Sequence, residues 1–390
     1  MVAANAVAIE PVAEEPGPIQ HRKVPPSSDF AHLLREVTRT TGKTYFAQVQ
    51  ELVRLASGPG RIGPFEFFLY RLFDDAIPAE RKAAFVGRGL RAQLVNKHFD
   101  PAVFDVGLDK LSFYARALEL GLPTPRVLAV YHAERAFPDA RSLRGTDELL
   151  AFLRDPSIYP LFGKPNSMSA SVGVASMTRL HAGDDEIEMS DGRRFPADRM
   201  AEELKRYFVE GYLLQTRLHP HPEIRAVSGA TLSTIRMMVL DLGDGPKVIR
   251  ASWRVPVGEN QADVAWRGNI MAAIDPATGV CERAGQGRGL ERRSLDNHPD
   301  SGRPIVGMTL PDWAAACELA VSAAGKFPDL PLVGWDMALT DRGPVLIELE
   351  PDGGDPSVTQ IASGVGLLDG PYAQFVEQVR KRGKFKPKRR

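Results

Sequence analysis

The sequence lacks the features that point to secretion or membrane insertion. It holds only two cysteines, Cys281 and Cys317, too few for the disulfide framework of a small secreted domain. No apolar run approaches the ~20 residues that a helix needs to cross a bilayer. The apolar start from Val2 to Ile9 has no basic residue before it and runs into Glu10, which is not typical of a signal peptide. We therefore expect a cytoplasmic protein in a reducing compartment.

An excess of charge of one sign is also missing. The 49 Lys and Arg residues balance the 49 Asp and Glu residues, so the formal net charge is zero. This balance argues against a surface that binds nucleic acid over its whole extent, and we expect no specific nucleic-acid partner. The exception is the segment 380–390, whose eleven residues include eight basic side chains and no acid. A solvated tail is the common interpretation of such a run, and weak contact with an anionic surface is the alternative.

The length of 390 residues predicts two or three structural units. Residues 1–28 are rich in Ala, Pro and Glu, which predicts a disordered leader. Residues 29–104 carry apolar side chains at helical spacing and predict a helical N-terminal region. Residues 105–375 mix strand patterns, helices and hairpin turns, and residues 376–390 form the basic C-terminal tail. The mixture predicts an α+β class with mostly antiparallel sheets rather than a repeated βαβ pattern.

The expected elements can be placed by periodicity and turn signals. The expected helices are 78–98, 109–120, 197–208 and 310–324, together with helices within 30–55. The expected strands are 126–131, 161–164, 172–179, 212–217, 231–241, 247–255, 270–275 and 345–349.

A lysine at the end of an expected strand is followed by a loop of small residues. Lys164 precedes a stretch that contains Ser169, Ser171 and Gly173. Small side chains let backbone N–H groups approach an anion, and the lysine supplies a positive charge. The stretch is not a Walker A loop, because the Gly-Lys-Ser order and the following helix are absent. An ordinary polar hairpin loop is the alternative, and composition alone favours it.

Three carboxylates are expected to lie close together near the C-terminal end of the α+β region. Glu348 and Glu350 are two apart on an expected strand and so share a face. The turn at 341–343 folds this strand back against Asp336. Three carboxylates on one face repel unless a cation lies between them, and Mg²⁺ binds one or two carboxylates together with phosphate oxygens and waters. A solvent-facing acidic strand is less favoured, because the apolar residues at 345–347 indicate a buried strand.

An apolar strand that runs into a proline-stiffened segment forms a third candidate site. Main-chain groups after Leu214 could pair with an adenine edge, and Glu223 could hold ribose hydroxyls. His219 and His221 suggest a metal pair, but Pro220 lies between them and no third ligand is near. Solvated loop histidines are the favoured interpretation.

Together these segments resemble the ATP-grasp superfamily and, in detail, the sugar-transfer associated ATP-grasp family, over roughly residues 105–375. The resemblance implies two α+β subdomains with the nucleotide between them, preceded here by the helical region. It implies that Lys110, in the Asp-Lys pair before the helix that ends in Gly-Leu-Pro-Thr-Pro, contacts ATP phosphate, as does Lys164. It also implies a phosphate loop and an adenine hinge. The residues in these two places are Ser169, Ser171, Gly173, Gln215, Arg217, Leu218 and Glu223, with Gln215 where many relatives carry Glu.

The resemblance also implies a metal site and two functional arginines. Asp336, Glu348 and Glu350 fall where the superfamily places its Mg²⁺ ligands, although the last is usually Asn, so that Glu350 adds a negative charge. Arg236 and Arg254 lie on strands similar to the family's two arginine-bearing strands. Arg236 would neutralise transferring phosphate and Arg254 would clamp a substrate carboxylate. A strand-face ion pair is the alternative for both.

The implied activity is that of an ADP-forming ligase that uses ATP and Mg²⁺. A carboxylate would attack the γ-phosphate, and an amine or other nucleophile would then displace phosphate from the acyl phosphate. The partners would be small-molecule carboxylates and amines, with sugar- or amino-acid-linked acceptors suggested by the family's association with sugar-polymer genes. A kinase on the same fold is one alternative, because it uses the same phosphate and metal groups. A non-catalytic binding protein that acts through its basic tail is the other.

Overall fold

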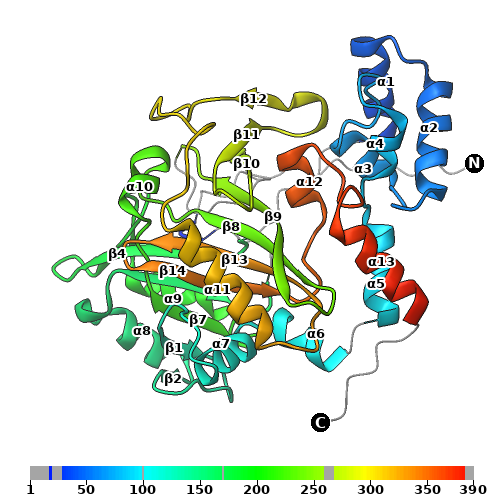
Figure 1. Ribbon diagram of the computed structural model, residues 1–390. Helices are drawn as coiled ribbons and strands as arrows, with labels where there is room; N and C mark the ends of the chain where they lie inside the picture. The colour runs from blue at the N-terminus through cyan, green and yellow to red at the C-terminus, as the bar shows by residue number, and fades with distance from the viewer. Residues whose placement is uncertain (1–16, 20–28, 99–100, 169–170, 259–267, 383–390) are drawn as a thin grey trace, which may run out of the picture.

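The computed structural model describes residues 17–19, 29–98, 101–168, 171–258 and 268–382 (Figure 1). Most of the segment predicted as a leader, the loop residue Ser169 and the last eight residues of the predicted tail therefore lie outside the described residues. In the described part, no helix is both long and apolar enough to span a membrane. Cys281 and Cys317 are both free thiols.

The chain begins with helices, as the apolar spacing predicts. Asp29 caps the first of them by accepting a hydrogen bond from the backbone N–H of Ala31 at 3.1 Å, and Gly42 ends it at a φ of 75°. The helices before the sheets are α1 (Phe30–Thr41), α2 (Tyr45–Ser57), α3 (Pro64–Leu69), α4 (Ala79–Ala83), α5 (Arg88–His98), α6 (Pro101–Leu108) and α7 (Lys110–Glu119).

The prediction of one helix over 78–98 is wrong, because residues 84–87 separate α4 from α5. Val86 uses its backbone N–H and carbonyl to pair with the buried side chain of Gln360, at 2.8 and 2.9 Å. The backbone N–H of Gly87 donates to Gly60, and a Cβ at position 87 would lie 2.5 Å from the carbonyl oxygen of Arg61. These long-range contacts replace the helical hydrogen bonds at this point.

Seven strands form sheet A, in the order β2-β1-β7-β3-β4-β5-β6, with α8 (Thr146–Leu153) and α9 (Ala197–Lys205) packed on it. All pairs are antiparallel except β1 with β2. The strands are β1 (Val127–Tyr131), β2 (Arg141–Leu143), β3 (Leu161–Pro165), β4 (Ala175–His181), β5 (Glu186–Met189), β6 (Arg194–Pro196) and β7 (Tyr212–Thr216).

Seven further strands form the antiparallel sheet B, in the order β12-β11-β10-β9-β8-β13-β14. The α+β class with mostly antiparallel sheets is confirmed. The strands are β8 (Thr234–Asp241), β9 (Pro246–Val255), β10 (Ile270–Ile274), β11 (Cys281–Gln286), β12 (Arg293–Leu295), β13 (Leu332–Thr340) and β14 (Gly343–Glu350). Short helices and turns are η1 (Pro156–Ile158), α10 (Pro222–Ser228) and η3 (Gly289–Glu291).

The two faces of sheet B differ in chemistry, because side chains alternate along each strand. One face is apolar: Trp253, Trp335 and their neighbours pack with α7 and with α11 (Trp313–Gly325). The opposite face is covered in part by the N-terminal helices, by α12 (Ser357–Ser363) and by α13 (Pro371–Arg382), which runs beside α5 (Figure 1). The part of this second face that the helices leave uncovered carries charged residues. We call this second face the polar face of sheet B.

Several element boundaries differ from those expected. The strand expected over 172–179 begins only at Ala175, because Ser171 and Gly173 lie in a turn with φ of 52° and 80°. Strands β2, β5, β6, β11 and β12 were not anticipated, since they are short and charged. Helix α13 extends through Arg382 and buries Val376, so the first residues of the segment predicted to be a tail are helical.

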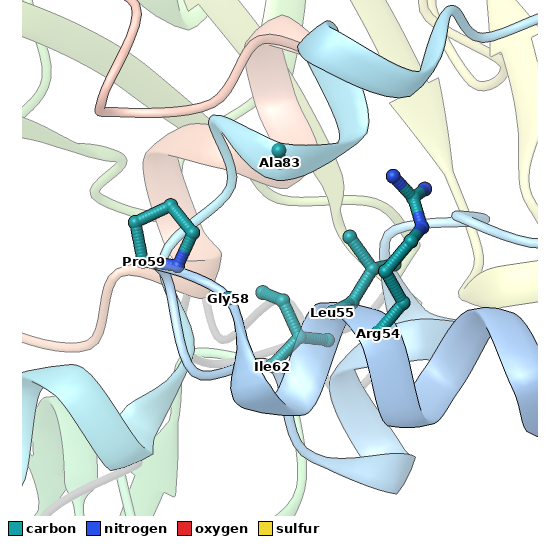
Figure 2. A pocket seen from close by; sticks show the side chains of 6 residues that line it. All are labelled: Arg54, Leu55, Gly58, Pro59, Ile62 and Ala83. Carbon is teal, nitrogen blue, oxygen red and sulfur yellow. The ribbon is translucent and has the colours of Figure 1, made fainter.

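A cavity of about 140 Å³ lies among the N-terminal helices (Figure 2). It is lined by Arg54, Leu55, Gly58, Pro59, Ile62 and Ala83. Sites for small molecules usually occupy about 300–1,000 Å³. This cavity is too small for a nucleotide, and none of its lining residues belongs to the predicted site.

Candidate active site

The polar face of sheet B brings the predicted carboxylates and arginines together. The strand register places Asp336 opposite Arg236 on β8 and opposite Glu348 on β14. The Nε of Arg236 donates to Asp336 Oδ1 at 2.5 Å, and its Nη2 donates to Glu350 Oε1 at 3.1 Å. Arg254 Nη2 lies 2.6 Å from the other oxygen of Asp336. The repulsion expected among the carboxylates is thus offset by cationic side chains of the chain itself.

Burial and these ion pairs shift the pKa values in opposite directions along the cluster. Burial disfavours the charged form of Asp336, but Arg236 and Arg254 outweigh it and hold its pKa below the usual range. Burial likewise opposes the charge of Arg236, yet Asp336 and Glu350 raise its pKa. For Glu350, burial raises the pKa to about 7; Arg236 opposes this shift, and Glu348 and Asp336 add to it.

Lys110 reaches the same cluster from the start of α7. Asp109 caps this helix by accepting from the backbone N–H of Ser112 at 2.8 Å. Lys110 Nζ lies 3.1 Å from Glu348 Oε1 and donates to the carbonyl of Met168 at 2.7 Å. Its ammonium group therefore bridges β14 of sheet B and the loop after β3 of sheet A.

Lys164 comes from the end of β3 and is almost fully buried, at 6% exposure. Its Nζ donates to the hydroxyl of Tyr114 at 2.8 Å and lies 4.9 Å from the centre of that ring. The Tyr114 hydroxyl in turn donates to the carbonyl of Ile347 at 2.8 Å. Burial lowers the pKa of Lys164 to about 8, although the charges of Glu348 and Asp336 oppose this shift. The two predicted lysines thus meet β14 from different elements.

A buried amide fixes the loop after β3 to the start of α7. Asn166 donates from Nδ2 to Asp109 Oδ2 at 2.5 Å and accepts at Oδ1 from the backbone N–H of Leu111 at 2.9 Å. Arg135 holds both oxygens of Asp109, each at 2.6 Å. Burial opposes the charge of Asp109, but these hydrogen bonds keep its pKa below the usual range. Together they orient the residues that flank Lys110.

Asn166→Ala is expected to lower the free energy of unfolding by about 1–3 kcal/mol, because it leaves the buried N–H of Leu111 and the half-buried carboxylate of Asp109 without one partner each. Urea denaturation of the full chain measures the change. The matched control is Ser167→Ala, since the hydroxyl of this exposed neighbour bonds, within the described residues, only Glu210, at 3.3 Å. Equal stability of both variants would show that the amide does not hold the loop.

The predicted hinge residues lie at and after the end of β7. Gln215 is buried, and its Nε2 has no hydrogen-bond partner among the described residues. Arg217 and Leu218 follow the strand and are half-buried. Arg217 donates through its backbone N–H to Pro160, and burial, followed by the charge of Arg225, lowers the pKa of its guanidinium. Glu223 is exposed on α10, where the sequence suggested a loop.

In the described part of the chain, no hydrogen bond or ion pair joins the hinge residues or Gly173 to the carboxylate cluster. Gly173 accepts a hydrogen bond from the Tyr212 hydroxyl at 2.9 Å, and a Cβ there would lie 2.5 Å from the Tyr207 hydroxyl. Its lack of a side chain is therefore required by packing as well as by its positive φ. The roles predicted for these residues stay predictions.

Sequence reasoning missed three contributors to the site. They are Tyr114, Asn166 and the pair Arg91–Asp352, in which Arg91 Nε donates to Asp352 Oδ2 at 2.5 Å. Arg91 also places positive charge near Glu350. The Asp-Gly-Gly sequence after Pro351 was a signal for the last pair, since Gly353 and Gly354 take φ of 83° and 80° in a tight turn behind β14.

The donor set fits Mg²⁺ held jointly with phosphate rather than by protein alone. Among the described residues, no group of three or more His, Cys, Asp or Glu side chains is arranged to hold a metal ion. Mg²⁺ typically takes one or two carboxylates and completes its shell with phosphates and waters. Glu348 and Glu350 keep 28% and 27% of their side chains exposed, whereas Asp336 keeps 6%. The buried Nη1 of Arg236 also has no partner in the described part of the chain, as expected where an anion binds.

Comparison with solved structures finds two ligases and a synthase at low identity. A D-alanine–D-alanine ligase from Coxiella burnetii is 12% identical with a TM-score of 0.38 and covers 71% of this chain and 59% of its own. An L-amino acid ligase from Bacillus licheniformis is 14% identical with a TM-score of 0.42, covering 79% and 54%. An N5-carboxyaminoimidazole synthase from Aspergillus clavatus, bound to ADP, is 12% identical with a TM-score of 0.37, covering 75% and 63%. The chain thus spans just over half the length of the first two.

The family comparison is more specific. A search of curated proteins finds no significant sequence match. Residues 89–378, however, match a family model within the ATP-grasp class. The chain belongs to the sugar-transfer associated ATP-grasp family. The α+β ATP-grasp fold with a helical region before the sheets is thereby confirmed.

Proposed function

We propose that the protein is a Mg²⁺-dependent ligase that activates a carboxylate with ATP and joins it to an amine or another nucleophile. The observation that carries this proposal is the meeting of Lys110, Lys164 and Arg236 around the carboxylates of β13 and β14. Phosphoryl transfer needs little covalent help from a protein; it needs positioning and neutralisation of charge. Cations from both sheets and from α7 supply that charge in one place.

Within this proposal, the residues that bind the nucleotide have the following roles. Lys110 and Lys164 would bind phosphate oxygens, since each presents an ammonium group between the sheets. Gln215 would offer its unpartnered Nε2 to the adenine, with Arg217, Leu218 and Glu223 beside it. The phosphate loop would include Ser171 and Gly173, with Ser169 lying outside the described residues. Each of these assignments rests on position and charge.

Arg236 would stabilise the transferring phosphoryl group through Nη1, and Arg254 would orient the reacting carboxylate by releasing Asp336. Glu348 and Glu350 would hold Mg²⁺, with Asp336 contributing the lone pairs that its arginines leave open. When bound, the metal would neutralise phosphate charge during transfer. A half-buried Glu348 that already pairs with Lys110 links metal binding to phosphate binding.

Mg-ATP is expected to raise the thermal stability of the full chain. A ligand at 100 times its dissociation constant adds about 2.7 kcal/mol of stability. Differential scanning fluorimetry with Mg-ATP, Mg²⁺ alone and Mg-GTP measures the shift and its base selectivity. A folded protein whose melting temperature stays constant at millimolar Mg-ATP would contradict the proposal.

Product analysis then tests the ligase chemistry. A panel of acids and amines is screened for release of ADP and phosphate, with AMP measured in parallel. ADP and free phosphate that appear only when acid and amine are both present support ligation. Transfer of the γ-phosphate onto a hydroxyl compound would contradict it and would instead indicate a kinase.

A further inference from the structure

A half-buried arginine, Arg292, lies on the polar face of sheet B at a place to which the proposed chemistry gives no role. Arg292 follows η3 and precedes β12. A Cβ added to Gly285 would lie 2.9 Å from Arg292 Nη2 and 3.0 Å from Cζ, so the guanidinium rests directly on the backbone of β11. Its Nη1 is buried and has no hydrogen-bond partner in the described part of the chain.

The strand register shows that this guanidinium shares a face with the proposed active site. Gly285 on β11 lies opposite Met271 on β10, and Met271 lies opposite Arg254 on β9. Directly opposed residues of antiparallel strands project from the same face. Adjacent strands lie about 4.8 Å apart, so Gly285 is roughly 10 Å from Arg254 across the sheet.

Two further arginines converge on Arg292 from different elements. Arg283 is two residues before Gly285 on the same face of β11, and its Nη1 donates to the carbonyl of Ser363 at 2.7 Å. Arg71 follows α3 of the N-terminal region, and its Nη1 donates to the carbonyl of Gly289 in η3 at 3.4 Å. Burial, followed by the charges of Arg283 and Arg71, lowers the pKa of Arg292 to about 10.

In the described part of the chain, the only ion pair made by these three arginines is a weak one at Arg71. Arg71 Nη2 lies 3.9 Å from Asp74 Oδ2, and both side chains are more than one-third exposed. An ion pair this long and this exposed is weak. Among the described residues no ion pair to Arg292 or Arg283 is found. A largely desolvated charge without a partner is costly, and a bound anion would offset that cost. The planar guanidinium fork matches carboxylate and phosphate oxygens.

We propose that Arg71, Arg283 and Arg292 form an anion-binding subsite that holds a carboxylate or phosphate group at the far end of the substrate. The reacting end would lie at Arg254, so the substrate would carry two polar ends roughly 10 Å apart, which is about three extended amino-acid residues. The subsite also explains why helices precede the ATP-grasp sheets, since α3 delivers Arg71 to it. The orientation of the substrate rests on the proposed function, whereas the binding of an anion does not.

The test measures binding of two probes, inorganic phosphate and succinate, to the full chain without nucleotide. The background is Lys164→Met, which removes a cation from the proposed ATP phosphate site and leaves the arginine cluster intact. Isothermal titration should show that Arg292→Gln weakens binding of at least one probe tenfold or more. The matched control is Arg293→Gln, an exposed neighbour whose Nη2 bonds Gln286 at 2.7 Å, and it should stay within twofold. The probe that binds tells which oxyanion the subsite prefers.

Stability separates a binding role from a structural one. Without a probe, Arg292→Gln should melt at a higher temperature than its parent, because an uncompensated buried charge is removed. A lower melting temperature together with unchanged probe affinity would overturn the proposal, as would the absence of binding of both probes to the parent. If Arg292→Gln does not fold, Arg71→Gln must weaken probe binding at least threefold, or the subsite does not exist. Mg-ATP binding is measured separately, so failure of the nucleotide site is told apart from failure of this subsite.

Discussion

Lys164→Met is expected to stabilise the ligand-free protein and to abolish its binding of Mg-ATP. Lys164 is 6% exposed, and burial is the main cause of its lowered pKa. Met fills a similar volume without a charge, and the Tyr114 hydroxyl keeps its bond to the carbonyl of Ile347. We expect a gain of about 1–3 kcal/mol at pH 7, measured by urea denaturation, because a buried charge with a neutral partner costs more than an apolar side chain.

The pH dependence of that gain follows from the pKa shift. The pKa of Lys164 is about 8 in the folded chain, whereas the ordinary pKa of a lysine, which applies to the unfolded chain, is 10.5. Between these values the unfolded chain binds more protons, so the wild type gains stability as the pH rises. The advantage of Lys164→Met should therefore be full below pH 8 and should shrink towards pH 10.5. An advantage that stays constant over this range would show that the charge is not its cause.

The binding part of this prediction needs a control that alters a lysine elsewhere. Lys326→Met is suitable, since the ammonium group of this exposed lysine at the end of α11 bonds the carbonyl of Leu120 and, among the described residues, pairs with no member of the carboxylate cluster. Lys326→Met should keep the Mg-ATP melting shift of the wild type, and Lys164→Met should lose it. A variant that is both more stable and still bound by Mg-ATP would place the nucleotide away from Lys164.

The sequence predicts the parts of this site that depend on local pattern. The apolar run at 345–347 and the short turn at 341–343 predict the hairpin, and the observed register sets Asp336 against Glu348. The Asp-Lys pair predicts a helix start, and Asp109 is indeed the cap of α7. In each case the decisive interactions lie within a few residues or across one tight turn.

The partners of the charged residues could not be predicted in the same way. Arg236 meets Asp336 across 100 residues, Arg91 meets Asp352 across 261, and Tyr114 meets Ile347 across 233. A strand pattern says which face a carboxylate occupies and nothing about which cation faces it. The sequence therefore suggested that only a metal could relieve the carboxylates, whereas the fold supplies arginines and a lysine.

The same limit explains why the arginine subsite has no sequence signal. Arg292 acquires its place because Gly285 leaves room on β11, and Arg71 arrives from a helix more than 200 residues earlier. β11 and β12 are short and charged, so their pairing was not expected. Only the register of sheet B shows that Arg254 and Arg292 share one face.

Glu348→Gln is expected to reduce turnover by about 100–1,000-fold, the range for losing one charge-stabilising group in a transition state. Glu348 joins the proposed metal site to Lys110, 3.1 Å away, and its side chain keeps 28% exposure. The amide keeps the shape of the side chain and one acceptor oxygen, but it removes the negative charge that attracts Mg²⁺. The measurement is ADP release at saturating ATP over a range of Mg²⁺ concentrations, and the variant should need at least tenfold more Mg²⁺ for half-maximal rate.

Two further variants serve as comparisons for Glu348→Gln. Glu350→Gln should be milder, at about tenfold, because the amide oxygen can still accept from Arg236 Nη2 and Asp336 still balances that arginine. Glu119→Gln should have no effect, since this exposed residue of α7 pairs only with Arg116 on its own helix. Circular dichroism establishes that all three are folded. A wild-type rate and Mg²⁺ dependence in Glu348→Gln would show that this carboxylate holds no catalytic metal, and the ligase mechanism proposed for the site would then be wrong.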